Sequence, residues 1–155
     1  MTYDASYWDI VWSRPYGRYN KHHEDVWSAI YPLLGSKIVD LGCGPALIYS
    51  GKNIDVTGVD ISPRAIVEAK KNYPMGKFIV ADAGKTGLPS DSFDSALISG
   101  LLDYYEDWEI ILSEARRITK QGGKILATLF NGYNNHNWTK YQHLTGNWYL
   151  YQETR

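Results

Sequence analysis

The chain has 155 residues and a formal net charge of −1 at pH 7, which indicates a single domain and gives no electrostatic reason to expect a nucleic-acid partner. No apolar run approaches the ~20 residues that span a bilayer, and the amino terminus lacks the basic and apolar segments of a signal peptide. The single cysteine, Cys43, cannot form an internal disulfide, so we expect a cytoplasmic protein without a membrane partner.

The pattern of apolar residues predicts helices and strands in alternation. In chain order we expect a helix over 24–34, a strand over 37–41, a short helix within 45–51, a strand over 55–60, a helix over 63–72, strands over 77–81 and 93–99, a helix over 107–119, and strands over 124–130 and 147–152. Ser62 followed by Pro63 is a strong helix start, because serine is a good N-cap and proline suits the first helical position. This alternation favours a mostly parallel α/β sheet with right-handed crossovers.

Aromatic residues gather at both ends of the chain. Of the 6 Trp and 13 Tyr residues, 14 fall within residues 1–31 and 133–151. We therefore divide one domain, 1–155, into an aromatic lid and helix (1–35), an aliphatic core (36–130) and an aromatic cover (131–155). The rings suit either the walls of a pocket or simple end-packing, and the composition alone does not separate the two.

Two acids end neighbouring strands at the most informative part of the chain. Asp40 closes an apolar run that opens into Gly42 and Gly44, and Asp60 closes the next apolar run. The carboxyl ends of parallel strands are where an open α/β sheet binds its ligand. Glycines there let the backbone approach a ligand, and an acid can accept hydrogen bonds from ribose hydroxyls. The pattern predicts a nucleoside site.

Five segments in this order also resemble the class I S-adenosylmethionine-dependent methyltransferases, of the small-molecule, methyltransferase type 11-like kind. They are residues 37–45, 56–63, 78–83, 92–99 and 114–124. The resemblance implies a doubly wound Rossmann-like sheet and S-adenosyl-L-methionine as the cofactor. It also implies a small-molecule methyl acceptor as the partner. Only about 25 residues follow the fifth strand, so we expect the sheet to be reduced at its C-terminal end, and an edge left exposed there makes a homodimer plausible.

The resemblance places four residues beside the methionine part of the cofactor. Gly42 and Gly44 would let the backbone pass close to it, and Asp40 would lie near its amino group. Ser99, at the end of the fourth strand, would lie beside the methionyl portion. The family often has a third glycine where this chain has Ala46, which is less permissive of unusual backbone angles.

Four further residues are implied around the adenosine part. Asp60 would accept from the ribose hydroxyls and Ile61 would pack against the adenine. Asp82 would accept from the exocyclic amine of the adenine, with Ala83 close to the ring. Ordinary turn and cap chemistry is the alternative for any one of these acids. Asp94, within the fourth strand, is expected to be structural.

Accessory groups are expected from the two ends and from the segment after the fourth strand. Tyr7 lies in a segment that similar methyltransferases fold over the cofactor, and Arg18 either pairs with the cofactor carboxylate or is solvated. Tyr104 is a candidate for lining the acceptor pocket or for a base, and lining the pocket is the preferred role. His22 is a possible base or simply an exposed histidine. Candidates for the opposite wall are His136, Trp138, Tyr141, His143 and Trp148.

Three other functions compete with methyl transfer. A cofactor-binding domain without catalysis, or a truncated one, fits the short C-terminal end. An enzyme that cleaves S-adenosylmethionine would use the same site. A nicotinamide enzyme would need a glycine at position 47, which is Leu, and we rank it lower. The four histidines and one cysteine show no metal-ligand spacing.

Overall fold

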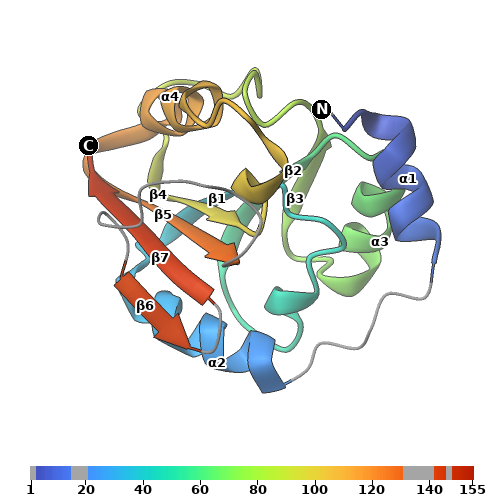
Figure 1. Ribbon diagram of the computed structural model, residues 1–155, viewed down its shortest axis with the longest axis horizontal. Coiled ribbons are helices and arrows are strands. Elements are labelled where there is room, and N and C mark those ends of the chain that lie inside the picture. Colours follow the sequence, from blue (N-terminus) through green and yellow to red (C-terminus); the bar gives the residue numbers. More distant parts are fainter. Residues whose placement is uncertain (1–2, 15–20, 131–141, 146–147) are drawn as a thin grey trace.

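The computed structural model describes residues 3–14, 21–130, 142–145 and 148–155, and its central element is one seven-stranded sheet (Figure 1). The strand order is β3-β2-β1-β4-β5-β7-β6, with β1 to β5 parallel and β7 antiparallel to both β5 and β6. The strands are β1 Lys37–Leu41, β2 Asp55–Asp60, β3 Lys77–Val80, β4 Phe93–Ser99, β5 Thr119–Phe130, β6 Gln142–Thr145 and β7 Trp148–Thr154.

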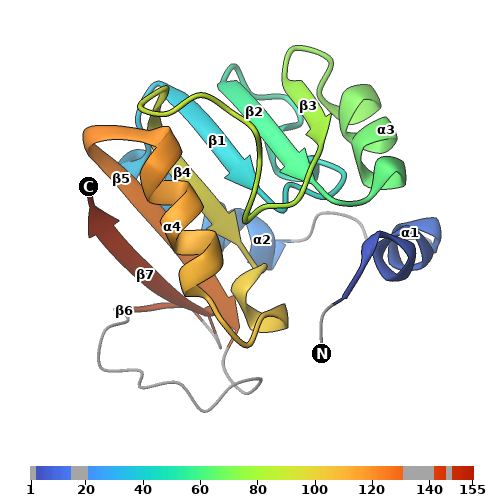
Figure 2. The same ribbon diagram turned by 90° about the horizontal axis from the view of Figure 1, so that it is seen from above.

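Helices cover both faces of this sheet, as the doubly wound expectation requires. The helices are α1 Ala5–Ser13, α2 Lys21–Ile30, α3 Pro63–Asn72 and α4 Glu109–Ile118, with short 3₁₀ helices η1 Tyr31–Leu33, η2 Leu47–Tyr49 and η3 Leu102–Tyr104. In Figure 1, α4 lies on one side of the sheet and α2 on the other, and Figure 2 shows α4 over β4 and β5. No helix in the described part of the chain is both long and apolar enough to cross a membrane.

Alternation along the strands divides the core in two. Ile38 packs with α2 and α3, whereas the next residue, Val39, packs with α4. This follows from strand geometry, because successive side chains point to opposite faces. The two cores hold the parallel strands rigidly and fix where their carboxyl ends lie.

Helix α1 docks on the start of α3 and was not predicted from sequence. The Asp9 carboxylate accepts a hydrogen bond from the Ser62 hydroxyl and one from the Arg64 amide at 3.2 Å. The Arg64 side chain donates to the Trp12 carbonyl at 3.3 Å. Ser62 itself caps α3, accepting from the Ala65 amide at 3.0 Å, so the predicted N-cap is confirmed. These contacts bring the aromatic N-terminal segment to the carboxyl edge of the sheet.

Three predicted boundaries are corrected by the structure. The helix expected over 24–34 is α2 followed by η1, because Pro32 interrupts regular helix at that point. The short helix within 45–51 is reduced to η2. Strand β5 starts at Thr119 rather than at residue 124, since Thr119 already pairs with Phe93 and a register shift follows.

The C-terminal end adds two antiparallel strands to the sheet where the sequence predicted one. Strand β7 agrees with the strand expected over 147–152, and β6 was missed. Strand β7 covers the edge of β5 from Lys124 to Phe130, and the four-residue β6 is the edge of the sheet at this end. The homodimer stays a prediction.

Candidate functional site

A cavity of about 430 Å³ lies at the carboxyl edge of the sheet. Because β1, β2 and β4 are parallel, their last residues and the loops that follow meet there. Helix α1 and the first residue of the antiparallel β7 complete the walls. The lining residues are Trp8, Trp12, Asp40, Gly42, Cys43, Gly44, Pro45, Ala46, Leu47, Ile48, Asp60, Ile61, Ala83, Ser99, Gly100, Leu101, Tyr104, Tyr105 and Trp148.

Strand β2 holds the glycine loop that follows β1, because three amides of the loop donate hydrogen bonds to residues of β2. The amides of Gly42 and Cys43 both donate to the Val59 carbonyl, at 2.8 and 3.0 Å, and the Gly44 amide donates to the Asp60 carboxylate at 2.8 Å. A phosphate-binding loop needs free amides aimed at the ligand. This loop has none at these positions, and only the three-residue η2 follows it. The geometry disfavours a dinucleotide such as a nicotinamide cofactor.

Backbone angles explain why small residues occupy this loop. Gly42 has φ +78°, and a Cβ there would lie 2.9 Å from Leu101 Cδ1. Gly44 has φ +51° and lies under the ring of Trp12. Ala46, in place of the third glycine, also adopts a left-handed conformation, with φ 55°. The loop therefore keeps the backbone shape that glycine would favour, at a cost of roughly 1–2 kcal/mol for the alanine.

Asp60 is the buried acid at the end of β2, 7% exposed. Its Oδ2 accepts from the Gly44 amide and its Oδ1 accepts from the Ser62 amide at 2.9 Å. Burial raises the pKa of Asp60, the two backbone hydrogen bonds oppose the rise, and the charge of Asp9 adds to it. A carboxylate has about four acceptor positions, so this one retains capacity for ligand hydroxyls.

Asp40 is buried more deeply, 1% exposed, within β1. Its Oδ2 accepts from the Tyr49 hydroxyl at 2.7 Å. Its Oδ1 is buried and has no hydrogen-bond partner among the described residues. Burial raises the pKa of Asp40 to about 7; the Tyr49 hydrogen bond lowers it, and the charge of Asp60 raises it further. A buried acceptor of this kind calls for a donor from a ligand.

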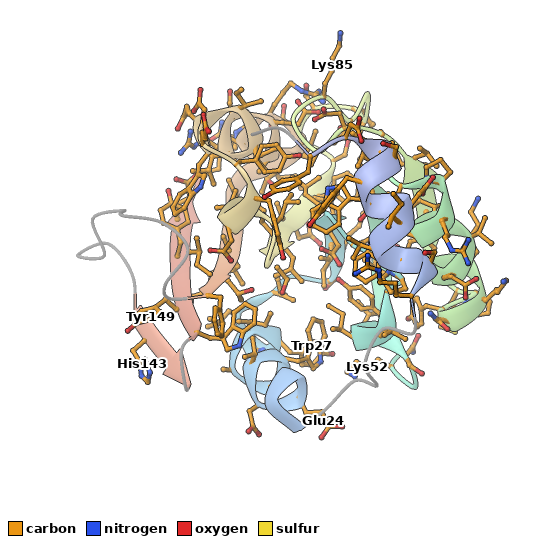
Figure 3. The ribbon with its side chains drawn as sticks, turned by 45° about the vertical axis from the view of Figure 1, so that its right-hand side comes forward. Glu24, Trp27, Lys52, Lys85, His143 and Tyr149 are labelled. Carbon is orange, nitrogen blue, oxygen red and sulfur yellow. The ribbon has the colours of Figure 1, made fainter. Side chains whose placement is uncertain are left out.

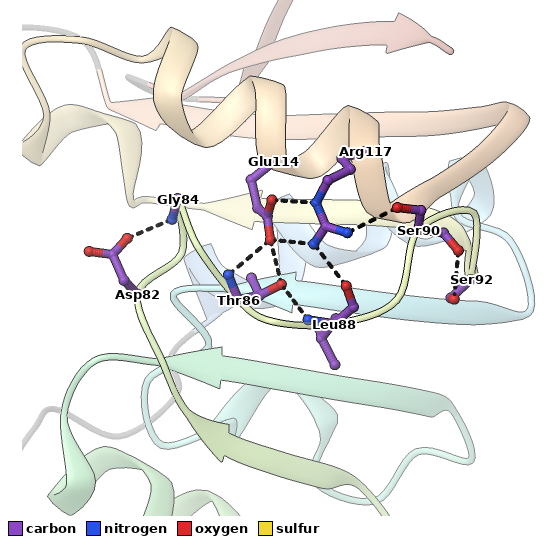
Figure 4. A network of polar contacts seen from close by, with 8 residues as sticks. All are labelled: Asp82, Gly84, Thr86, Leu88, Ser90, Ser92, Glu114 and Arg117. Atoms are coloured by element: carbon purple, nitrogen blue, oxygen red, sulfur yellow. Dashed lines mark hydrogen bonds and ion pairs between the residues drawn. The ribbon is translucent and has the colours of Figure 1, made fainter.

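The loop after β3 brings Ala83 to the cavity and is held to α4 (Figure 4). Glu114 accepts from the Thr86 amide at 2.9 Å and from the Thr86 hydroxyl at 2.6 Å. Arg117 donates to Glu114 and to the Leu88 carbonyl, at 2.8 Å in each case. The Arg117 hydrogen bond is the main reason that the pKa of Glu114 falls to about 2. This network fixes the loop without entering the cavity.

An aromatic wall closes the cavity on the side away from the sheet. Trp8 meets Tyr104 edge to face, with ring centroids 4.8 Å apart, and stacks with Trp12 at 6.3 Å. Trp148 lies near Gly100, where an added Cβ would be 3.7 Å from its ring. Tyr105 is half-buried, and burial together with the charges of Asp82 and Asp60 raises its pKa. The site thus pairs an acidic floor with an aromatic cover.

Most sequence-predicted site residues meet in this cavity. The eight that line it are Asp40, Gly42, Gly44, Asp60, Ile61, Ala83, Ser99 and Tyr104. Asp82 is exposed beside it, and its Oδ1 accepts from the Gly84 amide at 2.7 Å. Tyr7 does not line the cavity; its ring lies 5.2 Å from that of Trp8. Arg18 lies outside the described residues, and so does the side chain of His22.

Of the candidates for the opposite wall, one lines the cavity, one lies away from it and three fall outside the described residues. Trp148 lines the cavity, whereas His143 is exposed on β6 beside Tyr149, 5.4 Å between ring centroids (Figure 3). His136, Trp138 and Tyr141 lie outside the described residues. Asp94 has the structural role expected of it, accepting from the Lys37 amide at 2.9 Å and pairing with Lys120.

Sequence reasoning missed two contributors to the site. Trp12 lines the cavity, and Tyr49 donates a hydrogen bond to Asp40. The helical spacing of Trp8 and Trp12 was a usable signal, since residues four apart share one helix face. Tyr49 gave no signal, because its contact with Asp40 depends on how the glycine loop folds back. Among the described residues, no group of three or more metal-ligating side chains occurs.

Comparison with known proteins gives the family. Residues 39–127 match the methyltransferase domain family, and the chain belongs to it. The demethylmenaquinone methyltransferase of Streptomyces avermitilis is 31% identical over 126 residues, which are 79% of this chain and 50% of that protein. The ubiquinone biosynthesis O-methyltransferase of Thiobacillus denitrificans is 26% identical, over 64% of this chain and 47% of that protein.

Solved structures agree with the fold. An S-adenosylmethionine-dependent methyltransferase from Mesorhizobium loti superposes with a TM-score of 0.59 at 28% identity, covering 68% of this chain and 54% of that one. The chain spans about half the length of these relatives. The family match, over residues 39–127, includes the glycine loop and the ends of β1, β2 and β4, whereas α1 and β7 lie outside it.

The cavity fits the cofactor of this family, S-adenosylmethionine. That molecule carries a sulfonium, an ammonium and one carboxylate, so its net charge is positive. The described walls contain two carboxylates and no basic side chain, and the unpartnered Oδ1 of Asp40 offers an acceptor for an ammonium group. Aromatic faces also suit a sulfonium.

Proposed function

We propose that this protein transfers the methyl group of S-adenosylmethionine to a small acceptor bound in the cavity at the carboxyl edge of the sheet. The observation that carries the proposal is a combination of two features. The amides of the glycine loop are already hydrogen-bonded within the protein, and two carboxylates, Asp40 and Asp60, are buried beside them. That combination favours a cationic nucleoside over an anionic dinucleotide.

The proposed contacts follow the strand ends. Asp60 would accept from the ribose hydroxyls, and Ile61 and Ala83 would enclose the adenine, with Asp82 accepting from its amine. Gly42, Gly44 and Ser99 would lie beside the methionine part, and Asp40 would accept from its amino group. Arg18 would pair with its carboxylate. Tyr7 would support the cover through its contact with Trp8.

The bound cofactor supplies an electrophilic methyl group, so the chain has little covalent chemistry to perform. Its task is to hold the acceptor in line with that methyl, which is worth about 7–11 kcal/mol. The rings of Trp8, Tyr104 and Trp148 exclude water and present faces to a cation, worth about 0.5–2 kcal/mol. If the acceptor must lose a proton, Tyr104 and His22 are the candidate bases.

The acceptor is proposed to be a hydroxylated aromatic ring of the quinol type. Two observations support this choice: the described wall is aromatic, and the named relatives are a demethylmenaquinone methyltransferase and a ubiquinone biosynthesis O-methyltransferase. A flat, apolar acceptor would stack in this wall without needing a charged partner.

The test is to incubate the protein with S-adenosylmethionine and a short-chain demethylmenaquinol, and to identify the products by mass spectrometry. We expect S-adenosylhomocysteine together with the methylated quinol. Methylthioadenosine in its place indicates cleavage of the cofactor. Tight binding of the cofactor without either product, for this and other phenolic acceptors, would instead support a binding domain without catalysis.

Two variants of Tyr104 distinguish a residue that lines the acceptor pocket from one that acts as a general base. We predict that Tyr104→Phe keeps most of the turnover, because the ring remains, and that Tyr104→Ala raises KM several-fold. Steady-state kinetics for the two variants checks this. A kcat for Tyr104→Phe that drops by about 10²-fold or more, with KM unchanged, would identify the hydroxyl as the base.

A further inference from the structure

Tyr49 is a buried titratable side chain that the proposed methyl transfer does not use. It lies in η2, directly after the glycine loop, and is fully buried. Its ring packs edge to face on Trp27, 5.4 Å between centroids, and lies 5.8 Å from the ring of Tyr73. These contacts leave the ring little freedom, so the direction of its hydroxyl is set by the core.

That hydroxyl donates a hydrogen bond to Oδ2 of Asp40, at 2.7 Å. The other carboxylate oxygen, Oδ1, is buried and without a partner among the described residues, and Asp40 belongs to the cavity lining. A carboxylate held at one oxygen has a fixed orientation, and the acceptor capacity of the buried Oδ1 is left for a ligand donor. The Tyr49 hydrogen bond thus orients Asp40 as an acceptor for one ammonium group.

We propose that Tyr49 is a positioning residue for the cofactor: it orients and stabilises the ionised form of Asp40, which receives the cofactor's amino group, so that binding expels a proton from Asp40. This proposal rests on the proposed function, because it concerns the same cofactor. The proton leaves the Asp40 carboxyl for solvent, and the ammonium group of the ligand takes its place as the donor to Oδ1.

Two acids of this cluster have raised pKa values. Burial raises the pKa of Asp60, on the neighbouring strand, against its two backbone hydrogen bonds, and the charge of Asp9 adds to the rise. Burial raises the pKa of the Cys43 thiol and of the Tyr49 phenol well above their usual range, so both stay neutral. Asp40 has a pKa of about 7, and an ammonium group beside it would lower that pKa. Binding should therefore strengthen as the pH rises.

The experiment measures binding by calorimetry between pH 6 and pH 8 with two ligands. S-adenosylhomocysteine carries the amino group, and methylthioadenosine lacks it. For the unaltered protein, a pKa near 7 predicts that affinity for S-adenosylhomocysteine rises ~10-fold over this range, beyond any rise for methylthioadenosine. Pairing the ligands cancels a contribution of Asp60 at the ribose, which is common to both. The Asp40→Asn variant then separates the amino group from the carboxylate, which methylthioadenosine also lacks.

Two variants and a matched control test the role of Tyr49. Tyr49→Phe should move the rise in affinity to higher pH and weaken S-adenosylhomocysteine binding about fivefold at pH 7, with methylthioadenosine unaffected. Asp40→Asn should abolish the difference between the ligands in pH dependence. Tyr73→Phe removes a buried hydroxyl that bonds to Ile54 instead, so its profile should match the unaltered protein.

The outcomes separate this proposal from the proposed function. Binding of both ligands with superimposable pH profiles for Tyr49→Phe and Tyr73→Phe overturns the role of Tyr49. Retention of the pH dependence in Asp40→Asn overturns it as well, even if Tyr49→Phe fails to fold. Failure of the unaltered protein to bind either ligand overturns the cofactor site itself.

Discussion

Asp60 is the side chain on which both the architecture and the proposed chemistry depend. It joins the glycine loop to the start of α3 through the amides of Gly44 and Ser62. The same carboxylate faces the cavity that is proposed to hold a ribose. Its removal should therefore disturb two properties that a suitable control can separate.

We predict that Asp60→Ala weakens S-adenosylhomocysteine binding by about 1–3 kcal/mol, the range for a lost buried hydrogen-bond partner, and also lowers stability. Calorimetric titration and urea unfolding measure the two effects. Asp94→Ala is the matched control, because Asp94 also accepts from a backbone amide but lies at the opposite edge of the sheet. Its stability should fall while its affinity stays unchanged. An unaltered affinity in folded Asp60→Ala would remove the ribose assignment.

Single residues could be predicted where chain position alone fixes their place. Asp60 and Ser99 end parallel strands and Asp40 is the second-last residue of another, so their convergence at one edge follows from the strand pattern. Trp148 reaches the same edge only because β7 runs antiparallel to β5, which places its first residue beside Phe130. That direction is a tertiary property that the local sequence does not encode.

Helix α1 is attached to the start of α3 through Asp9, and it contributes Trp8 and Trp12 to the wall of the cavity. We predict that Asp9→Ala costs ~1 kcal/mol of stability, as for a lost N-cap, and weakens cofactor binding several-fold because Trp8 and Trp12 lose their support. Tryptophan fluorescence titration checks the affinity. Glu68→Ala, which removes only an exposed pair with Lys71 on α3, should leave it unchanged. Equal affinities for both variants would contradict the role of α1.

The loop after β3 depends on a second attachment, between Glu114 and Arg117. We predict that Glu114→Gln lowers the free energy of unfolding by about 1.5–3 kcal/mol at pH 7, because the charge that Arg117 and Thr86 bind is lost. Glu109→Gln is the control, since Glu109 is an exposed partner of Arg116 and its loss should cost less than about 1 kcal/mol.

The same carboxyl gives a pH dependence with a defined sign. The pKa of Glu114 is about 2 in the folded protein, below its ordinary value of 4.5, so its stabilisation is fully present above pH ~4.5 and is lost as the pH falls toward 2. Urea unfolding at pH 7 and pH 3 should show the difference between the unaltered protein and Glu114→Gln shrinking at the lower pH. A constant difference would contradict the assignment.

Elements with strong local signals were predicted well, and others were not. The Ser62-Pro63 start and the apolar runs fixed α3, β2 and β4 at their observed bounds. Strand β6 has no comparable apolar run, and it exists because β7 offers it an edge. Helix α1 carries rings that sequence analysis assigned to a lid, and its helical form depends on capping by Asp4 and docking on α3.

The whole molecule is a parallel sheet extended by an antiparallel pair, with a cavity where strand ends, α1 and β7 meet. The parallel strands provide the acidic floor, and segments distant in sequence, α1, the segment after β4 and β7, provide the aromatic cover. The acidic floor was predictable, because a parallel sheet brings the ends of neighbouring strands, and so Asp40 and Asp60, together. For the cover, the sequence predicted aromatic residues from the two ends of the chain, but not where each ring lies.

A crystal structure with bound S-adenosylhomocysteine locates the cofactor directly. We predict adenine between Ile61 and Ala83, ribose hydroxyls on Asp60, and the amino group on Oδ1 of Asp40, with the sulfur facing Tyr104. Electron density for the ligand elsewhere on the molecule, or a ribose that makes no contact with Asp60, would contradict it.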